Sequence, residues 1–222
     1  MHQYLKAIGF ENIQTRKDLK KLLKEVEENF THQTIVSYRP GEDFCEFQKE
    51  FGQDVGITLC GELDDEEHFE AAYYFPYFEG SGVTTYAEID VQRKIEKEQY
   101  VGLCEDSKIG ISLIFTLQNG VEYMREKQAG LAKDMQTSVT FSGLAQGGMI
   151  LLPVNKNEQQ ILNEKRASDT RKELMNAARK GDQAAIETLT FDVCVPAESV
   201  MGEPEIGRRF KGTIWLQGYI NF

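Results

Sequence analysis

The sequence predicts an α+β protein with a mostly antiparallel mixed sheet, an N-terminal helix, a helical pair near 157–189 and a C-terminal β segment. Two observations support this class. Short β-rich runs follow one another without the regular strand–helix alternation that builds parallel sheets, and the composition becomes polar and helical after Pro153. A chain of 222 residues can bury roughly 70% of its unfolded surface, so a sizeable core is available.

Changes in composition divide the chain into three parts. We assign an α+β domain to residues 1–154, a helical pair to 155–189 and a C-terminal β segment to 190–222. The junction at Leu189-Thr190 is abrupt, because no Gly, Pro or Asn turns the chain between helix and strand.

The N-terminal elements follow from local signals. Thr15 and Asp18 have the spacing of a helix N-cap and its acidic partner, and apolar residues then recur at helical spacing, which predicts a helix at 15–29. The β-rich segment 34–38 ends at a Pro-Gly turn signal, and the runs FCEF and DVGITLCGEL predict two further strands.

The middle of the chain carries an aromatic segment and an apolar strand. The aromatic residues of YYFPYF favour a strand, in which Pro76 requires an edge position or a bulge. The apolar run 109–117 is the candidate for a central strand. Asn119 is placed to cap a helix at 120–129, which Gly130 would end.

Two further β regions are predicted toward the C-terminus. SVTFSGLA and GGMILLPV are interpreted as a hairpin joined around Gly147-Gly148. In FKGTIWLQGYINF, bulky residues lie on both faces of the predicted strand, which implies burial or barrel closure.

Charge and cysteine usage limit the classes of partner. The net charge of -11 repels phosphate backbones and anionic lipids, so nucleic acid is disfavoured and no membrane partner is expected. The N-terminus lacks the pattern of a secretory signal, and no apolar run has the length of a membrane span. The four scattered cysteines are interpreted as reduced core residues. We expect a cytoplasmic protein.

The most suggestive functional feature is the aromatic segment with its adjoining Gly-rich turn. We identify Tyr73, Tyr74, Tyr77, Glu79 and Ser81 as candidate ligand-binding residues, because tyrosines offer apolar area together with a polar tip. In the competing interpretation, these aromatics only pack the two faces of a sheet. The leading hypothesis is a non-enzymatic binding or interaction module with a protein or small-molecule partner.

No metal site or cofactor is predicted. His2, His32 and His68 lie at no metal-ligand spacing, and EGSGV differs from a nucleophile elbow because Ser81 has Gly on both sides. The glycine run at 143–148 lacks the Lys-Ser/Thr of a phosphate-binding loop.

Two alternative functions stay open at this point. A hydrolase-like enzyme would use the carboxylates of 64–67 or of Glu105 and Asp106, and it requires a concave pocket with a carboxylic acid of raised pKa. A single-strand nucleic-acid binder would use Trp215 beside the basic residues of 208–211, although Trp215 is also interpreted as a buried core residue.

Several segments together resemble a clostridial-type bacterial family known only as a domain of unknown function. They are HQYLKAIGF, TRKDLKKLL, YYFPYFEGSGVT, GISLIFTLQN and MGEPEIGRRFKGTIWLQGYINF, and they span nearly the whole chain. The resemblance implies no activity, cofactor or catalytic residue. Members of that family look longer between the helical pair and the final strands, so we interpret this chain as a shortened member.

Overall fold

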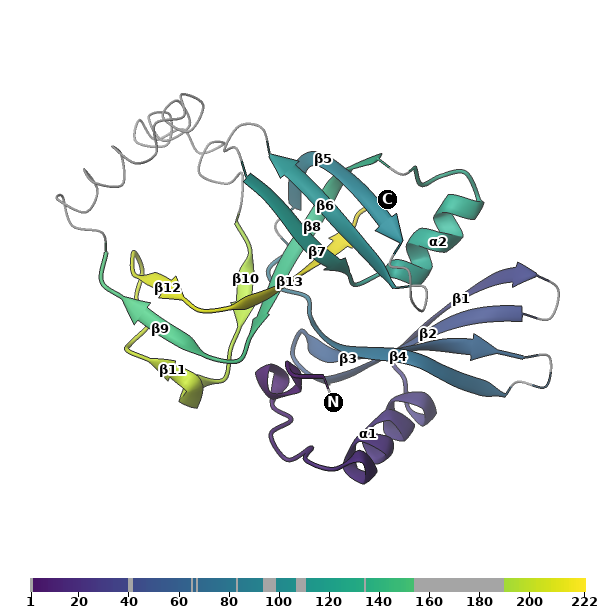
Figure 1. Ribbon diagram of the computed structural model, residues 1–222, viewed down its shortest axis with the longest axis horizontal. Helices are drawn as coiled ribbons and strands as arrows, with labels where there is room; N and C mark the ends of the chain where they lie inside the picture. Colours follow the sequence, from purple (N-terminus) through teal and green to yellow (C-terminus); the bar gives the residue numbers. More distant parts are fainter. Residues whose placement is uncertain are drawn as a thin grey trace.

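The computed structural model describes residues 2–39, 42–64, 66, 68–82, 84–93, 99–106, 111–133, 135–153 and 190–222. In these residues the chain forms three β-sheets, two α-helices and two short 3-10 helices, η1 (Leu5–Ile8) and η3 (Ala197–Ser199) (Figure 1). The predicted α+β class is confirmed in its coarser form, as mostly antiparallel strands with few helices. The single mixed sheet is corrected to three sheets, and the helical pair lies outside the described residues.

The first sheet is an antiparallel four-stranded meander in the order β1-β2-β3-β4. Its strands are β1 (His32–Arg39), β2 (Glu42–Gly52), β3 (Val55–Leu63) and β4 (Phe69–Phe78). The predicted strands therefore form, and β1, β2 and β4 are longer than their sequence signals. Because β4 is an end strand of this sheet, Pro76 occupies the edge position that its missing N–H requires.

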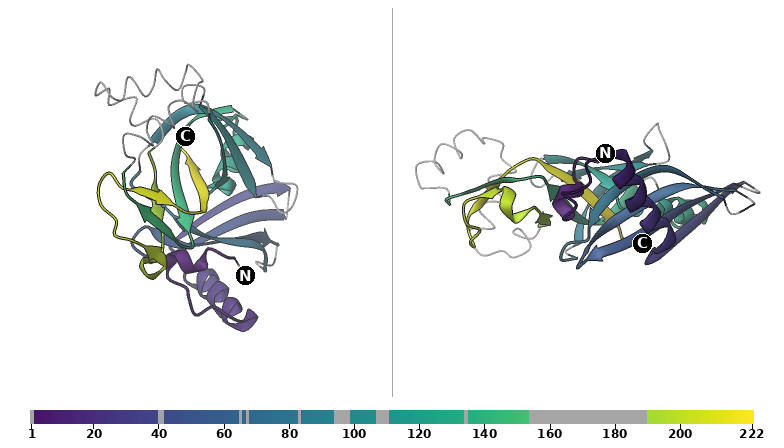
Figure 2. Two further views of the ribbon diagram at one scale, coloured as in Figure 1. Left: turned by 60° about the vertical axis from the view of Figure 1, so that its left-hand side comes forward. Right: turned by 90° about the horizontal axis from the view of Figure 1, so that it is seen from below.

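The N-terminal segment covers one face of this sheet. Helix α1 (Arg16–Glu28) begins with a capping box, in which Thr15 Oγ1 accepts from the Asp18 amide and Asp18 Oδ2 accepts from the Thr15 amide, both at 3.1 Å. Leu22 and Val26 are buried against the apolar side chains of β2 and β3. Figure 2 shows α1 on the side of the sheet that faces away from the second sheet.

The second sheet closes on itself like a small barrel. Its order is β10-β8-β13-β7-β6-β5, and β5 also pairs with β8. The strands are β5 (Thr84–Arg93), β6 (Tyr100–Asp106), β7 (Ile111–Leu117), β8 (Met135–Ala145), β10 (Asp192–Cys194) and β13 (Ile214–Ile220). β13 pairs antiparallel with β8 and parallel with β7, so the predicted barrel closure by the C-terminal segment is confirmed.

Glycines next to one aromatic ring allow the barrel to pack tightly. Phe115 of β7 is 1% exposed. Gly102 lies opposite it on β6, Gly218 is on the other neighbouring strand β13, and a Cβ at either glycine would collide with the ring. These two positions have no side chain because the ring occupies the space.

The prediction of a hairpin around Gly147-Gly148 is wrong. Strand β9 (Gly148–Leu151) pairs with β11 (Val200–Met201) and β12 (Arg209–Lys211) in a third sheet, and it makes no ladder with β8. Neither glycine has a positive φ. A Cβ on Gly148 would collide with the Phe210 ring, so this glycine serves close packing and does not form a tight turn.

Helix α2 (Gly120–Gln128) lies between the first sheet and the barrel. Val121 and Met124 pack against Val36, Phe44 and Cys60 on the sheet face opposite α1. Gly130 adopts the left-handed conformation just after the helix, as predicted. Asn119 is the N-cap residue, but its side chain makes no capping bond and pairs instead with β13.

The cysteines are largely internal. Cys45, Cys60 and Cys104 are buried and Cys194 is half-buried, which confirms their interpretation as core residues. No helix in the described ranges has both the length and the apolar composition of a membrane span.

Candidate functional site

Four of the five predicted ligand-binding residues, which lie on β4 or directly after it, line two different cavities. Tyr73 and Tyr74 line one cavity, Tyr77 and Glu79 line another, and Ser81 is exposed and lines neither. The five residues therefore do not form a single site. The two cavities also differ in chemistry.

We name the cavity at Tyr77 the amide cleft. It has a volume of about 340 Å³ and lies between the first sheet and the barrel. Its lining combines two amides, a carboxyl, three hydroxyls and two glycines, from Gln48, Tyr77, Glu79, Gly80, Gly82, Gln118, Thr140 and Tyr219. These residues come from both sheets and from the junction before α2, so only the folded chain brings them together.

Two buried glutamines join the barrel to the edge strand beside this cleft. The Gln217 amide accepts from the Phe78 N–H at 3.3 Å and donates to the Pro76 carbonyl at 2.8 Å. Gln118 donates to the Phe78 carbonyl at 2.8 Å and to Gln217 Oε1 at 3.1 Å. The side chains thus provide β4 with the donors and acceptor that a further strand would provide.

A buried carboxyl lies behind the wall of the cleft. Glu46 is 2% exposed, and its oxygens accept from Gln48 Nε2 at 3.0 Å and Cys60 Sγ at 3.8 Å. Burial raises the pKa of Glu46 to about 8, and the nearby Glu122 adds to this rise, while a hydrogen bond from the Val121 backbone opposes it. Glu46 therefore carries its proton at neutral pH. A charged residue within the apolar run FCEF was the one sequence signal for it.

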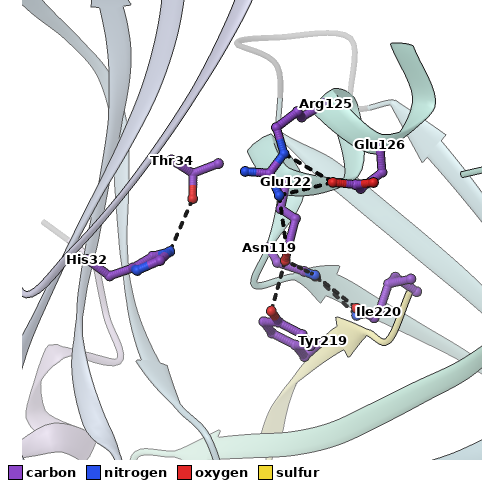
Figure 3. A network of polar contacts seen from close by, with 8 residues as sticks. All are labelled: His32, Thr34, Asn119, Glu122, Arg125, Glu126, Tyr219 and Ile220. Carbon is purple, nitrogen blue, oxygen red and sulfur yellow. Dashed lines mark hydrogen bonds and ion pairs between the residues drawn. The ribbon is translucent and has the colours of Figure 1, made fainter. Parts of the chain in front are cut away.

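Tyr219 connects the cleft to the start of α2. Its hydroxyl donates to Glu122 Oε2 at 2.8 Å, and Asn119 Nδ2 donates to the same oxygen at 2.9 Å (Figure 3). Asn119 also exchanges two hydrogen bonds with the backbone of Ile220, at 3.0 and 3.1 Å. Arg125 Nη2 lies 3.4 Å from the other carboxylate oxygen, Glu122 Oε1. The Tyr219 hydroxyl is therefore held in place by a network fixed to both α2 and β13.

Burial and nearby carboxylates raise the pKa of three groups in the cleft lining. Burial raises the pKa of Glu79, and Glu50 and Asp54 raise it further. Burial also raises the pKa of Tyr77, with added effects of Glu79 and Glu50, and the pKa of Tyr219 is raised by burial and by Glu122. In each case nearby negative charge opposes a further negative charge.

We name the cavity at Tyr73 and Tyr74 the aromatic pocket. It has a volume of about 450 Å³ and is lined by His2, Gln3, Tyr4, Tyr73, Tyr74, Gln99, Thr116 and Trp215. Trp215 is half-buried, not fully buried as predicted, and its indole N–H donates to Thr116 Oγ1 at 3.1 Å. The Trp215 ring stacks on Tyr4 with 5.4 Å between centroids.

The other predicted groups that the structure describes line neither cavity. Asp64, Glu66 and Glu105 are exposed, and the remaining side chains named for the hydrolase alternative lie outside the described set. Arg208 of the basic cluster is paired with Glu205 at 2.7 Å. In the parts of the chain that are described, no three or more His, Cys, Asp or Glu side chains gather as metal ligands. The enzyme and nucleic-acid alternatives stay untested predictions.

Comparison with known proteins gives one family match. The family described as "Domain of unknown function, E. rectale Gene description (DUF3881)" matches residues 5–192 and 188–218. The two matched segments meet at the Leu189-Thr190 junction, and the interpretation of a shortened member stays a prediction. No curated protein and no solved structure matches the chain.

Proposed function

We propose, for a chain that belongs to this E. rectale family of unknown function, a role as a cytoplasmic, non-enzymatic binding module that holds a small organic cation in the amide cleft. The observation that carries this proposal is the composition of the cleft lining. It combines a carboxyl, amides, hydroxyls and two tyrosines in about 340 Å³, which is within the usual size range of small-molecule sites.

The charge of the ligand follows from the carboxylates. Glu79 lies in the cleft lining, and its pKa is raised by burial and by Glu50 and Asp54. A bound ammonium group would relieve that repulsion, whereas a carboxylate or phosphate would increase it. The net charge of -11 favours the approach of cations over the whole surface in the same way.

The remaining lining supports recognition of the rest of the ligand. Tyr219, which is 40% exposed, offers a ring surface to an alkylammonium group, and the largely buried Tyr77 forms part of the wall behind it. Gln48 and Thr140 supply neutral hydrogen-bonding groups that orient polar substituents. Gln118 is fixed by three hydrogen bonds, to Phe78, Ser142 and Gln217, so this wall is formed before a ligand arrives.

Three probes with the same benzene ring test whether the amide cleft prefers a cation. Benzylamine is a cation, benzyl alcohol is neutral and benzoate is an anion, and calorimetric titration measures the affinity of the protein for each. We expect benzylamine to bind most tightly and benzoate most weakly. Equal affinity for benzylamine and benzoate, or the absence of binding by every amine in a panel that adds tyramine, choline and putrescine, would contradict the proposal.

A matched pair of variants tests whether the cation binds in the amide cleft. Glu79→Gln removes the charge in the cleft and is expected to weaken benzylamine binding about three- to tenfold. Glu70→Gln removes an exposed carboxylate of β4, outside the cleft lining, and should leave the affinity unchanged. Equal losses in the two variants would show that only the overall charge matters.

A further inference from the structure

We infer that the aromatic pocket is a second, independent binding site, which takes a neutral polyhydroxylated ring such as a monosaccharide or disaccharide unit. It is formed by the middle of β4 with the N-terminal segment, β7, β13 and Gln99, the residue before β6. Its lining shares no residue with the amide cleft.

The lining of the pocket selects a neutral ligand. Its polar groups are the amides of Gln3 and Gln99 and the hydroxyls of Thr116 and the tyrosines, and His2 supplies an imidazole. Among the residues that the structure describes, no carboxylate, Lys or Arg belongs to the lining. In a protein of net charge -11, this leaves a cation without a counter-charge and gives an anion nothing to offset the repulsion of the whole surface. Neutral hydrogen-bonding groups suit hydroxyls.

The arrangement of the rings selects a non-planar ligand. A flat heteroaromatic ligand would require two parallel rings with a gap between them, but the parallel pair, Tyr4 and Trp215, is already in contact. The other rings are tilted to one another, at 47° for His2–Tyr4, 41° for His2–Trp215 and 65° for His2–Tyr74. Tilted rings with polar groups between them suit a puckered ring that has C–H faces and hydroxyl edges.

Two hydrogen bonds hold the walls of the pocket before a ligand binds. The indole N–H of Trp215 donates to Thr116 Oγ1 at 3.1 Å, which fixes the ring against the barrel. The backbone N–H of His2 donates to the Tyr74 hydroxyl at 2.7 Å, which ties the N-terminal segment to the edge strand. A preformed pocket reduces the entropic cost of binding a small, weakly bound ligand.

The chain contains a single tryptophan, so Trp215 reports on this pocket alone. We would titrate the full chain with D-glucose, N-acetylglucosamine, maltose and cellobiose, and follow the tryptophan emission. A saturable change with at least one sugar, and none with adenosine or uridine, is expected. The inference is overturned if no sugar gives a saturable change up to its solubility limit, or if the nucleosides bind and the sugars do not.

Matched variants test whether the sugar binds in the aromatic pocket. Gln3→Ala removes one exposed amide of the lining and should weaken sugar binding about three- to tenfold. Gln53→Ala removes an exposed amide at the β2–β3 turn and should have no effect. Glu79→Gln, which alters the amide cleft, should leave sugar binding unchanged, so failure of one site is distinguishable from failure of the other. Equal effects of Gln3→Ala and Gln53→Ala would overturn the placement.

Discussion

The side chains of Gln118 and Gln217 meet amide to amide, with Gln118 Nε2 donating to Gln217 Oε1 at 3.1 Å. Each also bonds to the backbone of β4, and each is almost fully buried. Beside the cleft, the first sheet and the barrel are thus connected by two side chains that satisfy the open edge of a strand. This connection fixes one wall of the amide cleft, and its integrity is open to direct measurement.

Replacement of Gln217 by Met should destabilise the protein by about 2–4 kcal/mol. Met keeps the length of the side chain but leaves the Phe78 N–H and the Pro76 carbonyl without their partner on Gln217, and it removes one of the three acceptors near Gln118 Nε2. Urea unfolding followed by circular dichroism gives the free energy. Gln33→Met on the exposed side of β1 is the control and should be close to neutral. Similar values for the two variants would refute the role of this connection.

The Glu46→Gln variant should gain stability over the natural chain as the pH rises. The pKa of Glu46 is about 8 in the folded protein and 4.5 without burial, so between these values the unfolded chain releases a proton that the folded chain keeps. Stability of the natural chain therefore falls across this window, by up to about 1.4 kcal/mol per pH unit, and the fall ends above pH 8. Glutamine has no such proton.

The measurement is the melting temperature of both proteins from pH 5 to pH 9. The difference between Glu46→Gln and the natural chain should grow with pH and become constant above about pH 8. Glu70→Gln, at an exposed position, should stay parallel to the natural chain throughout. Parallel curves for Glu46→Gln would mean that the buried carboxyl titrates normally.

Thr58→Val should stabilise the protein by about 1 kcal/mol. Thr58 is fully buried in β3, and its hydroxyl has no hydrogen-bond partner within the described residues. Valine has nearly the same shape and removes the unsatisfied group. Thr34→Val is the matched control, because the Thr34 hydroxyl lies 3.4 Å from His32 Nε2, and it should bring no gain. Denaturant midpoints distinguish the two, and a loss of stability in Thr58→Val would count against the argument.

Gly102→Ala should cost about 2–4 kcal/mol, because the added methyl would occupy the space of the Phe115 ring. A smaller partner should reverse part of this loss, so the double variant Gly102→Ala with Phe115→Leu is expected to be less destabilised than the sum of the two single variants. Calorimetric melting gives these values. Gly120→Ala, where the nearest heavy atom to the new methyl lies at 3.4 Å, serves as the near-neutral control. Additive losses would indicate that the ring and the glycine do not interact.

Local signals predicted the elements that local interactions form. Helix α1 follows from the capping pair Thr15–Asp18, and strands β1 to β3 follow from β-rich runs between turns. The Gly147-Gly148 pair failed as a predictor because glycine permits both tight turns and close packing, and the Phe210 ring that decides between them is about 60 residues away. Three separate sheets were not evident from the sequence for the same reason.

The sites were predictable only in part. The sequence pointed to β4 and its turn, but it placed in one group residues that the edge strand divides between two cavities. The opposing walls come from remote segments, with Gln48, Gln118 and Thr140 facing Tyr77, and Thr116 and Trp215 facing Tyr73. Nothing next to those residues in the sequence marks them, since their common location depends on how the sheets pack.

The position of β13 also constrains the order of events during synthesis. The two strands that it joins, β7 and β8, are complete about 70 or more residues before β13 begins. At translation rates of roughly 5–20 residues per second, several seconds pass before β13 is synthesised. During this time β7 and β8 both lack the strand that will pair with them. During that interval, the β7 and β8 edges present unpaired backbone groups to any neighbouring polypeptide. Crowded polysomes are therefore the setting in which this protein is most exposed to misassembly.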